Sequence, residues 1–114
     1  MSQNTEKRKN HRLSSIAKAR IPKAFSGEAL LKDISITGCR IECTMQTEIQ
    51  EKSKYTITVY PEDISDIGCF ALLAECKWIY SGSEICEIGF DIKKSTGKRD
   101  FQRYVDYLFW RRKQ

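Results

Sequence analysis

Much of the chain alternates between hydrophobic and polar residues, as β-strands with one buried face do. Within residues 54–60, Tyr55, Ile57 and Val59 fall on one face, and lysine and threonine residues fall on the other. Pro22 interrupts the first such stretch, which indicates an edge strand or a bulge. The expected strands are 16–25, 29–34, 38–44, 54–60, 69–80 and 84–92. Short strands separated by polar turns predict a mainly β fold, a small antiparallel barrel or a sandwich.

The last part of the chain changes to the period of an α-helix. Apolar residues three and four apart form one stripe, made of Phe101, Tyr104, Val105, Leu108 and Phe109. This spacing predicts an amphipathic helix over about 97–112, capped at its start by Ser95 or Thr96. We expect the stripe to dock on the open side of the barrel, whose core needs a cover. The alternative is that the stripe binds a partner or a second copy of the chain.

Composition narrows the class of protein. The 114 residues are enough for one domain, and 40% of them are hydrophobic, as in globular proteins. The net charge of +5 favours anionic partners but is mild for a protein dedicated to duplex DNA. No apolar stretch is long enough to span a membrane, and the charged N-terminus does not resemble a signal peptide. We therefore expect a cytoplasmic protein without membrane insertion.

Residues that could support catalysis or bind a metal are scattered. The five cysteines form no C-x-x-C pair, and His11 is the single histidine, so no zinc site and no catalytic residues are predicted. The odd number of cysteines indicates reduced thiols. Cys39 and Cys43 alternate with charged residues, which is typical of small core residues on a strand. We expect a protein that is not an enzyme and needs no cofactor.

Two short patterns suit an anionic nucleotide instead. Arg8 and Arg12 form R-x-x-x-R within a basic run, and Asp33, Ser35 and Gly38 form D-x-S-x-x-G. A guanidinium can bind a phosphate as a fork, or bind the O6 and N7 atoms of guanine. A carboxylate can accept hydrogen bonds from the N1–H and N2–H groups of guanine, and a serine adds a hydroxyl. A glycine allows an unusual backbone angle or a close approach.

Each pattern occurs a second time. Arg99 and Arg103 repeat the arginine spacing on the predicted helix, where they are expected to form a solvated basic face. Residues 63–68 repeat the loop pattern at Asp63, Ser65 and Gly68, with an added carboxylate at Asp66 that would repel a diphosphate. Because no arginine pair lies just before this second loop, we assign the site to the first copies.

In this order, ahead of a run of strands and a terminal helix, the first copies resemble the PilZ domain family of bacterial cyclic di-GMP receptors. Trp78 and the later sequence Gly89-Phe90-Asp91 are similar to the closing hairpin of that family. Thr37 departs from a second glycine that the family often has in the loop. The resemblance implies a six-stranded antiparallel β-barrel with a C-terminal helix over 15–114, after a flexible basic segment over 1–14.

The resemblance also implies a receptor that binds cyclic di-GMP and signals to a partner protein when its N-terminal segment becomes ordered. The implied ligand-binding residues are Arg8, Arg12, Asp33, Ser35 and Gly38. The flanking Lys7, Lys9 and His11 are either secondary contacts or solvated charges. Motility, biofilm formation and secretion are the outputs that the family suggests. The sequence leaves open whether one or two dinucleotides bind, and whether the protein is a monomer or a homodimer.

Two other functions remain as alternatives. A small barrel that binds single-stranded RNA would interleave basic residues with exposed aromatic residues, whereas most aromatic residues here alternate with polar ones as core positions do. Nucleic acid is therefore not the expected partner. A PilZ-like scaffold that does not bind nucleotide is the second alternative, but it would have no need of both arginines and a complete loop.

Overall fold

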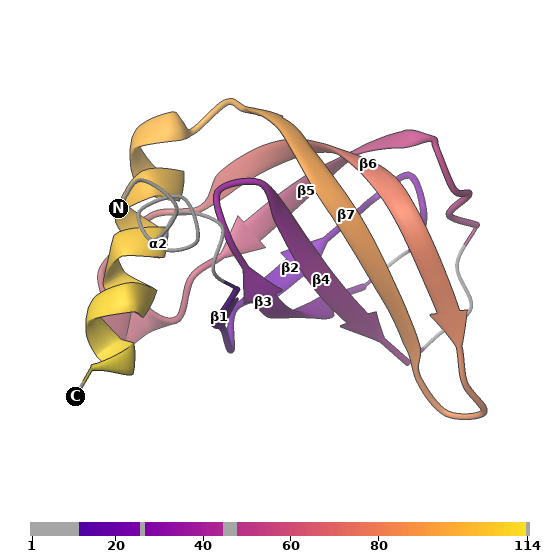
Figure 1. Ribbon diagram of the computed structural model, residues 1–114, viewed down its shortest axis with the longest axis horizontal. Coiled ribbons are helices and arrows are strands. Elements are labelled where there is room, and N and C mark those ends of the chain that lie inside the picture. The colour runs from indigo at the N-terminus through magenta and orange to yellow at the C-terminus, as the bar shows by residue number, and fades with distance from the viewer. Residues whose placement is uncertain (1–11, 26, 45–47, 114) are drawn as a thin grey trace, which may run out of the picture.

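The computed structural model describes residues 12–25, 27–44 and 48–113, and its strands form one antiparallel sheet that closes into a barrel (Figure 1). The strands are β1 (Leu13–Ser14), β2 (Lys18–Arg20), β3 (Ala29–Ile34), β4 (Gly38–Cys43), β5 (Lys54–Tyr60), β6 (Phe70–Ser81) and β7 (Cys86–Ser95). Their order is β1-β3-β2-β5-β6-β7-β4, and a β3–β4 pairing closes the ring. Since β1 and β2 both pair with β3, they are two parts of one interrupted strand. The predicted six-stranded antiparallel barrel is confirmed.

The first strand differs from the prediction of 16–25. Only Lys18–Arg20 are paired there, because residues 22–24 form a turn in which the N–H groups of Ala24 and Phe25 both donate to the carbonyl oxygen of Ile21. Pairing instead begins at Leu13, whose side chain is buried. The sheet therefore includes the last two residues of the segment that the sequence assigned to an N-terminal extension.

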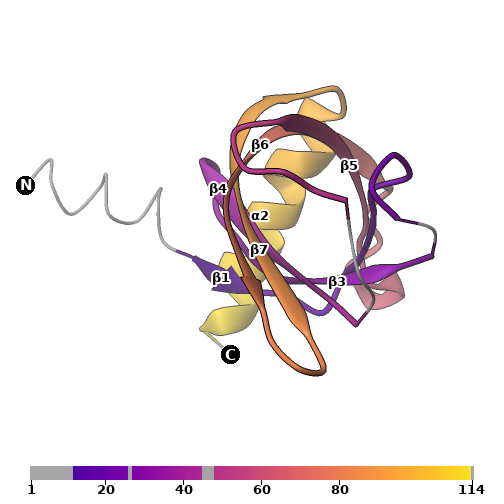
Figure 2. The ribbon, with the colours of Figure 1, turned by 90° about the vertical axis from the view of Figure 1, so that its right-hand side faces the viewer.

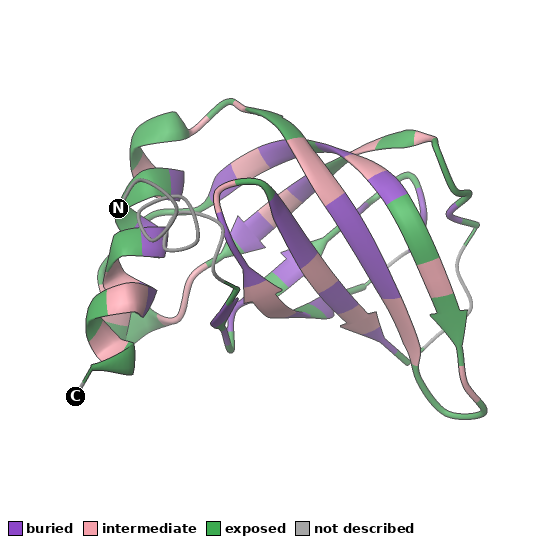
Figure 3. Cartoon of the chain, in the orientation of Figure 1, coloured by how far each residue is buried: buried purple, intermediate pink, exposed green. Residues whose placement is uncertain are grey.

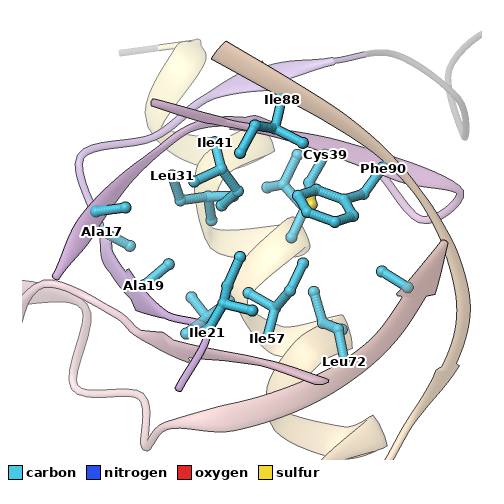
Figure 4. Close-up of a cluster of buried hydrophobic side chains, with 14 of the residues drawn as sticks. Ala17, Ala19, Ile21, Leu31, Cys39, Ile41, Ile57, Leu72, Ile88 and Phe90 are labelled. Atoms are coloured by element: carbon cyan, nitrogen blue, oxygen red, sulfur yellow. The ribbon is translucent and has the colours of Figure 1, made fainter. Parts of the chain in front are cut away.

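The core fills the inside of the barrel with alternate residues from every long strand (Figure 3). Figure 4 shows Ile21, Leu31, Ile57, Leu72 and Phe90 among the side chains that point toward one another across the interior. Each is at most 1% exposed, and burying such a side chain contributes roughly 1.5–3 kcal/mol. The alternation of apolar and polar residues therefore determines which face of each strand turns inward.

Helix α2 (Lys98–Arg112) covers one end of the barrel, as Figure 2 shows. Its buried residues are Phe101, Tyr104, Val105 and Leu108, so four of the five residues of the predicted stripe are in the core. The predicted caps are wrong, because β7 continues to Ser95 and its hydroxyl donates to the carbonyl oxygen of Ala71. Gly97 is the N-cap instead, where a Cβ atom would lie 2.8 Å from Phe70 Cβ.

A polar network joins the helix to the start of the barrel. The Tyr104 hydroxyl donates to Glu62 Oε1 at 2.7 Å and lies 2.7 Å from the Ser15 hydroxyl. Arg111 donates to Glu62 Oε2 at 2.9 Å and to the carbonyl oxygen of Ser14 at 3.0 Å. Because Ser14 and Ser15 follow Arg12 closely in the chain, this network fixes the backbone next to the candidate site.

Candidate functional site

A β-bulge places Asp33 on the outer surface of the barrel. Leu31 pairs with Ile41 and Asp33 pairs with Arg40, so Lys32 is an extra residue in β3. In a regular strand, Asp33 would point to the same side as the buried Leu31. The bulge turns the carboxylate outward, where its side chain is 16% exposed.

Two arginines contact this carboxylate, one at each oxygen. Arg12 Nη1 donates to Asp33 Oδ1 at 2.8 Å, which brings together residues 21 positions apart. Arg40 Nε lies 2.9 Å from Asp33 Oδ2, but this buried nitrogen forms no hydrogen bond within the described residues. The short distance therefore represents an ion pair with poor N–H alignment. Arg40 also donates from Nη1 to Glu87 Oε2 at 3.4 Å, which extends the chain of charges to β7.

Gly38 is required by the close approach of Arg12. A Cβ atom at this position would lie 2.9 Å from Arg12 Nη2 and 2.9 Å from the carbonyl oxygen of Phe90. Among the described residues, Gly27 is the only glycine with a positive φ, so Gly38 needs space rather than a special backbone angle. The glycine of the loop pattern thus lies directly beside the second arginine of R-x-x-x-R.

Ser35 shapes the loop between β3 and β4. Its side chain is fully buried, and its hydroxyl accepts hydrogen bonds from the N–H groups of Thr37 and Gly38, both at 3.2 Å. The Ser35 N–H also donates to the carbonyl oxygen of Gly38 at 2.8 Å. Such bonds define a serine turn, so the serine determines the loop conformation. Thr37 has no positive φ, and this conformation accommodates it in place of a second glycine.

The outward-facing row continues across two more strands. Arg40 pairs with Gly89 of β7, and Gly89 pairs with Trp78 of β6. A bulge at Lys77 turns Trp78 outward, although two residues earlier Cys76 is buried. The indole lies against Gly89, where an added Cβ would overlap the ring. The row therefore ends in an aromatic side chain that is 41% exposed.

Cys39 lies inside the barrel beneath the charged pair. Burial raises the pKa of its thiol to about 12, and of the nearby charges Arg12 lowers it while Asp33 raises it. The thiol is therefore protonated at neutral pH and cannot serve as a nucleophile. The charges above it suit recognition of polar groups, since two guanidinium groups and two carboxylates meet on one face.

The second copies of both patterns lie in different surroundings. Asp63 and Ser65 belong to the 3-10 helix η1 (Asp63–Ser65), and the Ser65 hydroxyl donates to the carbonyl oxygen of Glu62. Arg103 pairs with Asp100 on the exposed side of α2. Within the described residues no arginine pairs with Asp63, in contrast to the Arg12–Asp33 pair.

The structure adds residues that the sequence reasoning missed. Arg40 and Glu87 were not predicted as site residues. Arg40 lies between the core residues Cys39 and Ile41, and this alternation places it on the outer face of β4. Its contact with Asp33 depends on the bulge, which residue alternation does not reveal. Arg8, Lys7, Lys9 and His11 lie outside the described residues.

The described ranges contain neither a metal-binding cluster nor a membrane-spanning helix. No three His, Cys, Asp or Glu side chains there are arranged to hold a metal ion. No helix in the same ranges has the length and apolar character needed to cross a membrane.

Known proteins resemble this chain in sequence pattern and in fold. The PilZ domain model matches residues 6–110. No curated protein sequence matches. The Bacillus subtilis inhibitor of motility (MotI/DgrA) has a similar structure, with a TM-score of 0.74 and 12% sequence identity. The match covers 90% of this chain but 51% of that protein, so the chain spans about half its length. Since the family model covers nearly the whole sequence, the chain belongs to the PilZ domain family, whose domains are non-catalytic receptors for cyclic di-GMP.

Proposed function

We propose that this protein binds cyclic di-GMP through Arg8, Arg12, Asp33, Ser35 and Gly38, and passes the signal to a partner protein. The ion pair between Arg12 and Asp33 is the observation that carries the proposal. It joins the arginine pattern to the loop pattern on one surface, although the two are separated along the chain. A nucleotide bound by one pattern would therefore meet the other.

Each described residue has a defined role in the proposed complex. The Arg12 side chain is 46% exposed, so its guanidinium can bind a phosphate or a guanine while it remains beside Asp33. The Asp33 carboxylate accepts from the N1–H and N2–H groups of guanine. Gly38 leaves the space in which Arg12 lies, and Ser35 holds the loop in shape.

Arg40 and Trp78 extend the proposed site along the barrel. Arg40 holds the second oxygen of Asp33 and thereby orients the first. The exposed Trp78 indole offers a face on which a guanine can stack, a contact worth about 1–3 kcal/mol. The row Asp33–Arg40–Gly89–Trp78 is thus proposed to read a base at one end and to stack a base at the other.

The charges of the described site explain why the basic N-terminal run is needed. Arg12 and Arg40 contribute two positive charges, and Asp33 and Glu87 contribute two negative charges, so these four side chains are formally neutral. Cyclic di-GMP carries two phosphates, which must find further cations. In the proposal Arg8 supplies one of them, and Lys7, Lys9 and His11 add attraction or remain solvated. The segment that contains them becomes ordered around the ligand, and its new position is the signal.

The proposed receptor acts in the cytoplasm, where free thiols persist. All five cysteines are free, which suits a reducing compartment. By its family, motility, biofilm formation and secretion are the processes in which to look for its partner.

Isothermal titration calorimetry with cyclic di-GMP tests the proposal. We expect saturable binding that weakens at least tenfold in Arg8→Ala, Arg12→Ala and Asp33→Ala. The matched controls Arg99→Ala and Asp63→Ala remove the same residue types from the second copies and should bind like the wild type. Unchanged affinity in the first three variants would overturn the site. Tight binding of single-stranded RNA without a response to the dinucleotide would favour the RNA-binding alternative.

A further inference from the structure

A pocket of about 400 Å³ lies between the β3–β4 loop and the start of α2. Figure 1 shows this loop and the helix at the same end of the barrel. The residues that define its character are Ile36 of the loop, Ile92, Lys93 and Lys94 of β7, and Lys98 and Phe101 of α2. It is therefore separate from the row of Asp33, Arg40 and Trp78, but it shares the loop that leads from Asp33 to Gly38.

A third β-bulge shapes one wall of this pocket. Ala74 pairs with Ile92 and Leu73 pairs with Lys94, so Lys93 is an extra residue in β7. The bulge puts two consecutive lysines at the surface instead of one. Lys93 pairs with Glu75 at 3.8 Å, whereas Lys94 and Lys98 form no ion pair with any residue that the structure describes. Two cationic groups at the pocket are thus available for a ligand.

Beside the lysines and the polar Ser95 and Gln102, the pocket is lined by three apolar residues. Ile36 and Ile92 are partly buried hydrophobic residues packed against the core, and Phe101 belongs to the core itself. Phe101 is 7% exposed, so it offers an apolar surface but not an open ring face for stacking a base. Apolar walls edged by lysines match a peptide that presents one apolar side chain between carboxylates.

We propose that this pocket is the docking site for an acidic segment of a partner protein. The apolar side chain of that segment contacts Ile36, Ile92 and Phe101, and its carboxylates pair with Lys94 and Lys98. The volume is within the range of pockets that hold small ligands, which is sufficient for one large side chain and the adjoining backbone.

The pocket is also joined directly to the loop of the nucleotide site. The Ile92 N–H donates to the carbonyl oxygen of Thr37 at 2.9 Å, so a backbone hydrogen bond connects the pocket wall to the loop. A ligand that shifts the loop would therefore change docking, and this link rests on the proposed function. Docking itself does not require the nucleotide.

Fluorescence anisotropy with a fluorescein-labelled peptide, a leucine flanked by two glutamates on each side, tests the docking without nucleotide. We expect saturable binding that is at least fivefold weaker for Lys94→Glu and Lys98→Glu. A peptide with serine in place of leucine should bind at least threefold more weakly. The matched control is Lys23→Glu, the same charge change at an exposed turn residue, which should stay within twofold of the wild type.

Three results would overturn the proposal. The first is the absence of saturable binding at millimolar peptide. The second is an equal loss of affinity in Lys23→Glu, which would mean only general attraction to a basic protein. The third uses the Asp33→Ala protein, in which the proposed nucleotide site is disabled. If cyclic di-GMP still displaced the peptide from this variant, the pocket would itself be a nucleotide site. Because the peptide measurement contains no nucleotide, it stays informative if the protein fails to bind cyclic di-GMP.

Discussion

Replacing Tyr104 by phenylalanine should destabilise the fold although it leaves the aromatic ring in the core. The Tyr104 hydroxyl donates to Glu62 Oε1 at 2.7 Å. Because its single proton is engaged in that bond, its oxygen accepts from the Ser15 hydroxyl, which lies 2.7 Å away. The variant Tyr104→Phe would lose both bonds. The ring contacts with Phe70 and Tyr107 do not involve the hydroxyl and should remain.

The size of the expected loss of stability follows from the two hydrogen-bond partners of the Tyr104 hydroxyl, Glu62 and Ser15. A hydrogen bond to a charged group contributes about 1.5–3 kcal/mol, and a neutral one about 0.5–1.5 kcal/mol. Glu62 keeps its bond to Arg111, and Ser15 keeps the bond that its oxygen accepts from the N–H of Ala17. We therefore expect Tyr104→Phe to lower the free energy of unfolding by about 2–3 kcal/mol, less than the sum of the upper values.

Urea denaturation followed by circular dichroism measures this change. Tyr107→Phe is the control, since Tyr107 stacks on Tyr104 and no hydrogen bond of its hydroxyl is seen in the described structure. It should change the free energy of unfolding by less than about 0.5 kcal/mol, because Tyr107→Phe removes no hydrogen bond or ring contact that the structure describes. A Tyr104→Phe protein as stable as the wild type would refute the network as the connection between α2 and the start of the barrel.

Three further predictions concern the site and the thiols. Gly38→Ala should destabilise the protein by about 1–3 kcal/mol and weaken cyclic di-GMP binding at least tenfold, because the added methyl group meets Arg12 and the fixed carbonyl oxygen of Phe90. Calorimetry and urea denaturation check both changes, and wild-type values for both would contradict the account. Because its pKa is raised, Cys39 keeps its proton in the folded protein at pH values where the unfolded chain loses it. The contribution of this thiol to the free energy of unfolding should therefore be complete below pH 9 and be lost between pH 9 and about 12. This thiol lowers the free energy of unfolding by at most about 1.4 kcal/mol per pH unit. Urea denaturation between pH 8 and 10.5 should therefore show that the free energy of unfolding falls less steeply with pH in Cys39→Ala than in the wild type. The exposed Cys69 should react with a disulfide reagent before the buried Cys39 does, and equal rates in the native protein would show that the barrel opens more readily than its packing indicates.

The sequence predicted most of the fold because residue alternation reports burial directly. Ile57 and Val59 are in the core as expected, and strand β5 has the predicted bounds. The stripe of α2 was recognisable because three- and four-residue spacing can put apolar groups on one side only in a helix. These features depend on near neighbours in the chain, which a single sequence displays.

The geometry of the site was harder to predict because it depends on pairing between strands. Asp33 and Trp78 face outward only because bulges at Lys32 and Lys77 shift the register. A bulge leaves the order of residues unchanged and alters only which residues are opposite one another. Arg40 could therefore be placed on the outside of β4, but its contact with Asp33 could not be foreseen.

The errors at the ends of elements have a similar origin. Ser95 was a reasonable helix cap from its residue type, but it remains in β7 and bonds to Ala71 across the sheet. The first strand was drawn too long because Ile16 and Phe25 continued an apolar pattern across a turn that starts at Pro22. In both cases contacts with distant parts of the chain override local preference.

The central claim, that cyclic di-GMP binds at the first copies of the two patterns, can be tested most directly by a heteronuclear NMR titration of the ¹⁵N-labelled full chain. We predict saturable changes in the amide signals of Asp33, Gly38 and Arg40 and in the indole N–H signal of Trp78. Signals of Asp63 and Arg103 should stay within experimental error. Saturable changes centred on Asp63 or on Arg103, with those of Asp33 and Gly38 unmoved, would contradict the account.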